Sequence, residues 1–386
     1  MQLSSAAKHS DNPSDYPSGN LGDNPSDYSS VPVVLQLINA RAQRKRIGMG
    51  ILLLLLLTCA YVGLTRGSLP IDIEQQLRYF ISGANTVENT SANTTHWYVL
   101  SEIRLPRVIM TMLIGALLAV SGCAMQGLVR NPLADPGLIG IAGGAAAAAA
   151  LSMTIVPPLL PALESVWVAM WAFGGALLSV WTVLRFSNGP QGVSVAALIL
   201  AGVAINALTG TVIGAISYVA SDDALRQISY WTMGSLAGAS WTLCGLVALA
   251  SFIAITGLMK SRNALNLMAL GEKEAAYMGL NVTRYKQRVL WLVAFSVALA
   301  TALCGIIGFV GLVVPHMCRA IFGVNHQVLI PASALTGALL LIVADTLART
   351  LFVPMEIPIG IVTSAVGAPF FLYLLWQQRR IFSGGV

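Results

Sequence analysis

The side chains most able to do chemistry are few in this sequence, and they form neither a catalytic nor a metal-binding group. Five cysteines lie within or at the ends of apolar segments and show no paired spacing, which argues against a disulfide framework and against a zinc site. They are Cys59, Cys123, Cys244, Cys304 and Cys318. We therefore interpret them as packing residues.

A single histidine in "VVPHMCR", His316, could ligate haem iron or another metal. It stands beside Arg319 with no acidic residue or second histidine nearby, so a packed or interfacial histidine is the favoured interpretation. The turn "QGLVRNPLADPGLIG" also combines polar residues that could form a site. Its Asn131 and Asp135 can instead cap backbone amides where one helix ends and the next begins, and we assign the turn to architecture.

Three arginines have the type and spacing of carboxylate-binding groups. Arg104 and Arg107 lie three residues apart in "EIRLPR", and Arg349 lies in "DTLAR". A guanidinium can bind an acidic partner through charge-assisted hydrogen bonds. It can equally reach lipid headgroups, or Arg349 can pair with Asp345 four residues earlier on a helix. The residues alone leave these alternatives open.

A compact charged segment, "ALGEKEAAYMGLN" at 269–281, interrupts an otherwise oily chain. Asn263 can cap a short helix over 264–270 that Gly271 ends, and a second helix over 272–278 can end at Gly279. Apolar residues give this pair of helices one hydrophobic side. The pair, about residues 262–281, can anchor at a membrane surface or fit the groove of a partner protein.

The elements that position these residues are membrane-spanning helices. The chain has 386 residues, of which 56% are hydrophobic and 10% charged, and its mean hydropathy is +0.74. Runs of about 20 apolar residues, the length that crosses about 30 Å of hydrocarbon, recur from Ile47 onward. We predict an all-α integral membrane protein with ten spans, at about 47–64, 107–127, 138–156, 165–184, 191–213, 240–259, 288–306, 308–322, 328–350 and 358–376.

The charge distribution orients these spans and divides the chain. With ten spans, sixteen of the twenty-two Lys and Arg residues fall on one side, which the positive-inside rule makes cytoplasmic. Both termini are then cytoplasmic. Residues 1–46, with the hexamer "DNPSDY" twice and a basic flank "RAQRKR", are expected to form a disordered tail. Residues 47–380 form the transmembrane domain, and 381–386 a short C-terminal tail.

Several separated motifs carry a family resemblance over about residues 47–380. They are "IRLPRV" at 103, "GALLAVSGCAMQGLVRNPLADPGLIGIAGGAA" at 115, "LAGVAINAL" at 200, "ALGEKEAAYMGLNV" at 269, "GFVGLVVPHMCR" at 308 and "IPIGIVTSAVGAPFFLYLL" at 357. Together they resemble the FecCD-type permeases of ABC importers for iron-siderophores, haem and cobalamin. The resemblance implies a cobalamin-permease-like fold and a location in the bacterial inner membrane.

The resemblance also implies partners and residue roles. It implies a homodimer that works with two copies of a cytoplasmic ATPase and with a periplasmic substrate-binding protein. The chain would be no enzyme and hold no cofactor, since ATP would bind the partner subunit and no GxxxxGK loop occurs here. The arginines Arg104, Arg107 and Arg349 would dock the binding protein. The residues expected to contact the ATPase are Leu270, Gly271, Glu272, Glu274, Ala275, Ala276 and Gly279.

In this fold the cargo path runs between the two permease copies, lined by the fifth and tenth spans. The candidates on the fifth span and in the following outer segment are Asn206, Thr209, Ser217, Arg226, Tyr230 and Trp231. The outer segment is more similar to the haem branch, where an arginine could meet a propionate and an aromatic ring a porphyrin face. A ferric siderophore and cobalamin are the alternatives. An ion-coupled carrier is disfavoured because ionisable residues are scarce in the spans, and no nucleic acid is expected.

Overall fold

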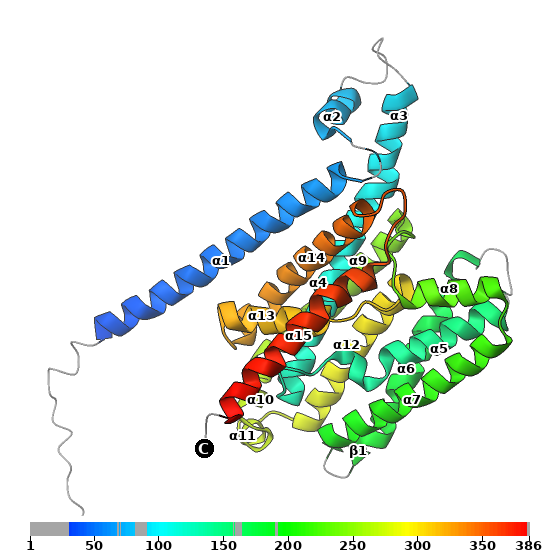
Figure 1. The fold of residues 1–386 in the computed structure, drawn as a ribbon. Helices are drawn as coiled ribbons and strands as arrows, with labels where there is room; N and C mark the ends of the chain where they lie inside the picture. Colours follow the sequence, from blue (N-terminus) through cyan, green and yellow to red (C-terminus); the bar gives the residue numbers. More distant parts are fainter. Residues whose placement is uncertain are drawn as a thin grey trace, which may run out of the picture. The chain divides into compact units, whose positions relative to one another are not determined.

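The computed structural model describes residues 31–67, 69, 71–81, 91–156, 158, 164–189 and 192–383. Apart from one two-stranded hairpin, its regular elements are helices (Figure 1). The helices before the hairpin are α1 (Val31–Thr65), α2 (Ile73–Ile81), α3 (Ser91–Tyr98), the π-helical turn η2 (Val99–Arg104), α4 (Leu105–Val129), the 3₁₀ turn η3 (Pro136–Ile139), α5 (Ile141–Thr154) and α6 (Glu164–Ser187).

The hairpin joins the first group of helices to the second. Its strands are β1 (Asn188–Gly189) and β2 (Gly192–Val193), paired antiparallel. After it come α7 (Val195–Val219), α8 (Asp222–Thr232), α9 (Trp241–Lys260), α10 (Arg262–Leu270), α11 (Glu272–Tyr277), α12 (Val282–Cys304), α13 (Val310–Phe322), α14 (His326–Thr350) and α15 (Ile359–Ser383).

The ten predicted spans all correspond to apolar helices. In the described part of the chain, eight helices are long and apolar enough to cross a membrane, and two shorter apolar helices, Ile141–Thr154 and Val310–Phe322, account for the other two. The short helix α13 contains Pro315. One of the eight segments, Thr94–Val129, starts well before the predicted residue 107, because α3, η2 and α4 follow one another without a break.

The chain divides into two units, residues 1–47 and 48–386. The expected disordered tail covered residues 1–46. Residues 31–46 instead form the first part of α1. They contain no Gly, and the apolar span that follows can nucleate a helix that extends back through them. Residues 1–30 lie outside the described residues, as do 384–386.

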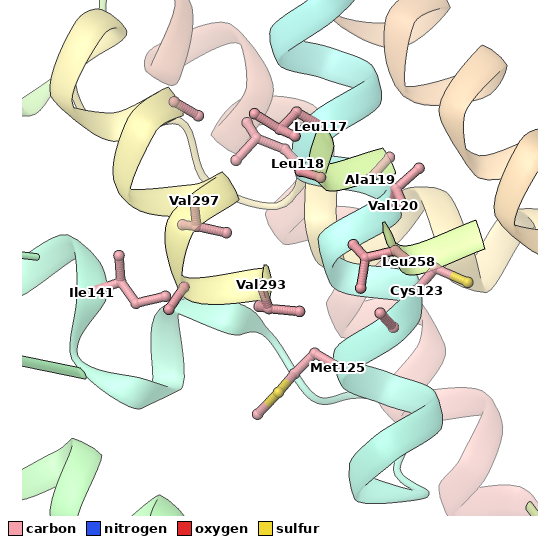
Figure 2. Packing of buried hydrophobic residues seen from close by; sticks show 14 of the residues in the cluster. Leu117, Leu118, Ala119, Val120, Cys123, Met125, Ile141, Leu258, Val293 and Val297 are labelled. Atoms are coloured by element: carbon pink, nitrogen blue, oxygen red, sulfur yellow. The ribbon is translucent and has the colours of Figure 1, made fainter. Parts of the chain in front are cut away.

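The core of the second unit surrounds α4. Figure 2 shows Leu117, Val120 and Met125 of α4 close to residues of the neighbouring helices, with Val293 of α12 on one side and Leu258 of α9 on another. All are buried. Because α4 is enclosed on several sides, it carries small and apolar residues around its circumference.

Glycines let α4 approach two neighbours at main-chain distance. A Cβ at Gly122 would overlap the carbonyl of Gly311 on α13, and a Cβ at Gly115 would overlap the carbonyl of Gly337 on α14. The same device joins α5 to α6 at Gly144. These glycines therefore mark close helix packing, the usual basis of helix association in membranes.

Two non-helical segments and the start of α15 meet at a second glycine cluster, which we call the glycine crossing: Gly234, Gly305 and Gly360. Gly234 and Gly305 have φ angles of 75° and 70°, which favour glycine. The amide of Gly360 donates to the carbonyl of Met233 at 2.9 Å, and Ser235 donates to the carbonyl of Cys304 at 2.7 Å. Main-chain bonds thus tie the end of α8, the α12–α13 link and the start of α15 together.

Candidate functional site: a charged helical segment and an arginine cluster

The charged segment folds as two short helices, α10 and α11, as predicted. Gly271 separates them with a φ of 141°, and Gly279 follows α11 with a φ of 87°. The predicted cap was wrong in detail. Ser261, not Asn263, precedes the first turn of α10, and the Asn263 side chain accepts a hydrogen bond from Gln327 at 3.1 Å.

One face of this segment is open and the other is buried. The open face carries Leu270, Tyr277, which is 89% exposed, and Met278. The exposed Glu274 and Ala276 lie on it too. An exposed apolar surface rimmed by charges is typical of a binding site for a protein or a membrane.

The buried face fixes the segment to the helical body. Ala275 is fully buried, and so are Leu265 and Met268 of α10, which join the main core. A larger side chain in place of Ala275 would therefore disturb the packing of α11 against the helical body rather than a contact at the surface. The predicted set of ATPase-contact residues thus divides into exposed members and members that hold the segment in place.

A polar cluster that sequence reasoning missed joins α10 to the start of α14. The Asn266 side-chain oxygen accepts from the backbone amide of His326 at 2.9 Å and lies 2.9 Å from its Nδ1, while the Asn266 amide donates to Asn325 at 3.0 Å. Asn263 and Asn266 lie three residues apart on α10, on one helix face. That spacing is the sequence feature from which the polar cluster could have been predicted.

The three arginines lie near the start of α4, at the opposite end from Gly127, which packs against His326. Arg104 is buried and donates to the carbonyls of Leu64 at 2.8 Å and Thr65 at 3.0 Å, and also to that of Leu69. Its donors thus hold the link between α1 and α2.

Arg107 and Arg349 share one carboxylate. Arg107 contacts Asp345 at 2.9 Å, and Arg349 contacts the same carboxylate at 3.0 Å, which is the helical pair left open by the sequence. Arg107 also binds Glu356 at 2.9 Å. Asp345 is 1% exposed whereas Glu356 is 48% exposed, so the second carboxylate is the accessible one. Glu356 was not foreseen, because nothing in the sequence links it to Arg107.

These arginines also line a cavity of about 200 Å³ together with Glu356 and Pro354. In this structure the three arginine side chains contact groups of the chain itself. A docking role for Arg104, Arg107 and Arg349 stays a prediction. The Arg107 side chain is itself only 9% exposed, and its second carboxylate partner, Glu356, is half exposed.

The predicted path residues lie on two helices. On α7, Asn206 is exposed, Ser217 is half-buried and Thr209 is buried, donating to the carbonyl of Ile205 at 2.9 Å. On α8, Arg226 and Tyr230 are exposed. Trp231 is half-buried and packs against the core. The structure does not bring these six together into one pocket, and their role stays a prediction.

The turn after α4 has the architectural role assigned to it. Asn131 accepts from the amide of Leu133 at 2.9 Å, and Asp135 accepts from that of Gly137 at 2.6 Å. Burial raises the pKa of the Asp135 carboxyl, and this hydrogen bond opposes the rise. His316 packs edge-on against Phe370. Across the described residues, no three His, Cys, Asp or Glu side chains come together as a metal site.

In the described part of the chain, eight long apolar helices and two shorter ones define a polytopic membrane protein. Residues 53–377 match the FecCD transport family, and the chain belongs to that family. It is 44% identical to the hemin transport system permease protein HmuU of Yersinia pestis, over 90% of this chain and 100% of that protein.

Two further comparisons agree with this assignment. A probable iron chelatin transport system permease protein of Helicobacter pylori is 35% identical over 83% of this chain and 96% of its own length. A solved structure described as an inward-facing metal-chelate type ABC transporter is 30% identical and superposes with a TM-score of 0.73, covering 85% of this chain and 98% of that one.

Proposed function

We propose that this chain is the permease subunit of an ABC importer that moves haem across the bacterial inner membrane. The observation that carries the proposal is the segment α10–α11, whose apolar and charged face is open while its other face is fixed to the helical body. Membership of the FecCD family supports the class of transporter. The full-length similarity to a hemin permease supports the cargo.

The energy source in this proposal is a separate ATPase, two copies of which bind the α10–α11 segments of a permease homodimer. The sequence contains no GxxxxGK loop to cradle phosphates, which supports a partner subunit as the site of ATP. The excess of basic residues on the α10–α11 side supports a cytoplasmic location for that segment and for both termini. A periplasmic binding protein would deliver the cargo at the opposite end.

An iron chelate or cobalamin is the second candidate cargo. Relatives of this chain include the iron chelatin permease already named and a cobalamin import permease BtuC of Halobacterium salinarum, 39% identical over 73% of this chain and 74% of that protein. An ion-coupled carrier finds little support, because Asp345, the buried acidic residue of α14, is already paired with two arginines.

Reconstitution tests the proposal. The permease, its co-encoded ATPase and the binding protein are assembled in proteoliposomes, and uptake of haem, a ferric siderophore and cobalamin is measured with and without ATP. We expect haem uptake that requires both the ATPase and the loaded binding protein. Uptake without an ATPase would overturn the importer assignment, and uptake of another cargo in preference to haem would overturn the assignment of cargo.

A further inference from the structure

One lysine of this chain, Lys286, is buried in the helical body. Lys286 lies on α12, next to the segment α10–α11, and is 5% exposed. Lysine is rarely buried without a partner because its charge is costly to remove from water. A lysine in this position therefore needs partners on the elements around it.

Lys286 has two partners, on two different elements. Its Nζ lies 2.6 Å from Oε1 of Glu272, the first residue of α11. The same Nζ donates to the backbone carbonyl of Val193 at 3.2 Å. Val193 ends strand β2, so one ammonium group joins α11, α12 and the hairpin between α6 and α7.

The hairpin leads directly into α7. Ser194 follows Val193 and caps α7, its side chain accepting from the amide of Ala197. Gly192, with a φ of 93°, lies so close to Thr283 that a Cβ there would approach the threonine hydroxyl to 2.8 Å. The hairpin is thus held against the start of α12, and the carbonyl bound by Lys286 lies one residue before the cap of α7.

The two helices of the segment are fixed at different places. Asn266 ties α10 to the start of α14, as described above, and Tyr285 donates to the carbonyl of Ser261 at 2.9 Å, which ties the α9–α10 junction to α12. The ion pair between Lys286 and Glu272 instead links α11 to the hairpin through the Lys286 ammonium group. The exposed face of the segment is therefore connected to the start of α7 by polar contacts that involve neither α10 nor α14.

We propose that Lys286 is the positioning residue that transmits displacement of α11 to the hairpin and to the adjoining end of α7. This inference rests on the proposed function, in which an ATPase moves α11. When α11 moves, separating Glu272 from Lys286 leaves a buried charge without its counter-ion, so the joint resists separation. The hairpin follows, since the same ammonium holds its carbonyl. Glu272 thus acts inside the permease rather than as an ATPase contact.

The test compares Lys286→Met with Lys286→Arg in proteoliposomes that contain the ATPase and the binding protein. Methionine keeps most of the side-chain volume but removes both bonds, whereas arginine keeps a charged donor. For Lys286→Met we expect normal ATPase association and a fall in uptake per ATP hydrolysed of at least about tenfold, as expected for loss of a charge-assisted hydrogen bond. Lys286→Arg should recover most of that loss. Lys260→Met, at the exposed end of α9, is the matched control and should change nothing.

A distance measurement separates transmission from a merely structural role. Spin labels on Asn188 of the exposed hairpin and on Lys260 report hairpin movement when ATP binds. We expect an ATP-dependent change in the wild-type distance distribution that Lys286→Met abolishes. An unchanged hairpin in the wild type, or a hairpin that still moves in Lys286→Met, would refute the inference.

Different results would refute the proposed function and the role of Lys286. If the wild-type permease binds no ATPase, the proposed function fails. If Lys286→Met binds the ATPase and transports at the wild-type ratio, only the role of Lys286 fails. Should Lys286→Met not insert into the membrane, Glu272→Gln replaces it, because this change keeps the bond to Val193 and weakens only the tie to α11. It should then lower uptake per ATP in the same direction, and an unchanged ratio would refute the inference.

Discussion

The carboxylate of Asp345 offers a sharp test of the arginine cluster, through the change Asp345→Asn. In the wild type its Oδ1 accepts from Arg107 Nε at 3.0 Å and its Oδ2 from Arg349 Nε at 3.0 Å. Asparagine has nearly the same shape but replaces one oxygen with an NH₂ group. That NH₂ group then faces a guanidinium N–H, so two hydrogen-bond donors oppose each other. Glu356 is then the one carboxylate that remains in the described cluster for the two buried arginines.

The magnitude follows from burial. Removing one member of a buried ion pair costs about 3–5 kcal/mol, because the remaining charge stays desolvated and unpaired. Arg349→Met should cost less, about 1–3 kcal/mol, because Arg107 then keeps both carboxylates. Combining Arg349→Met with Asp345→Asn should cost clearly less than the sum of the two, since the double variant removes one of the unpaired charges.

The assay is unfolding of the purified permease in mixed micelles by a denaturing detergent, which gives a free energy for each variant. Asp223→Asn on the exposed first turn of α8 is the matched control and should stay within about 0.5 kcal/mol of the wild type. If Asp345→Asn is as stable as the wild type, or if the two substitutions are additive, the cluster does not depend on this carboxylate in the way described.

Four other changes should separate packing from partner contact. Gly122→Leu should lower the yield of folded permease by size-exclusion chromatography, because a side chain there meets main-chain atoms of α13, and a normal yield would contradict the close approach. Glu274→Lys should leave stability within about 0.5 kcal/mol but weaken ATPase co-purification, while Ala275→Leu should cost about 1–3 kcal/mol of stability; the reverse pattern would show that the faces are misassigned. Glu356→Gln should speed association of the binding protein by freeing Arg107, with the gain lost at high salt, and an unchanged rate would remove Arg107 from the docking surface.

The sequence predicted the spans and the paired helices well because both depend on local signals. Apolar length defines α4 or α9, and Gly271 and Gly279 mark the ends of short helices by their backbone freedom. The continuation of α1 into residues 31–46 was missed for the opposite reason. The basic flank at 41–46 suggests solvent exposure, and exposure does not exclude a helix.

Partners that are distant in sequence could not be predicted. Glu356 meets Arg107 across 249 residues, and Lys286 meets Val193 across 93. Such pairs depend on how helices pack, which no local pattern records. The three arginines illustrate the limit well, since their side chains suit an external carboxylate and an internal one equally, and burial within the fold decides which they contact here.

The glycine crossing also limits which substitutions this fold can tolerate. The amide of Gly360 donates to the carbonyl of Met233 and the amide of Ile359 to that of Gly234, so no side chain takes part in these bonds. An exposed side chain nearby, such as Tyr230, can therefore change while the backbone keeps its course. A larger residue at Gly305 has no such freedom, because the Trp231 carbonyl occupies the space.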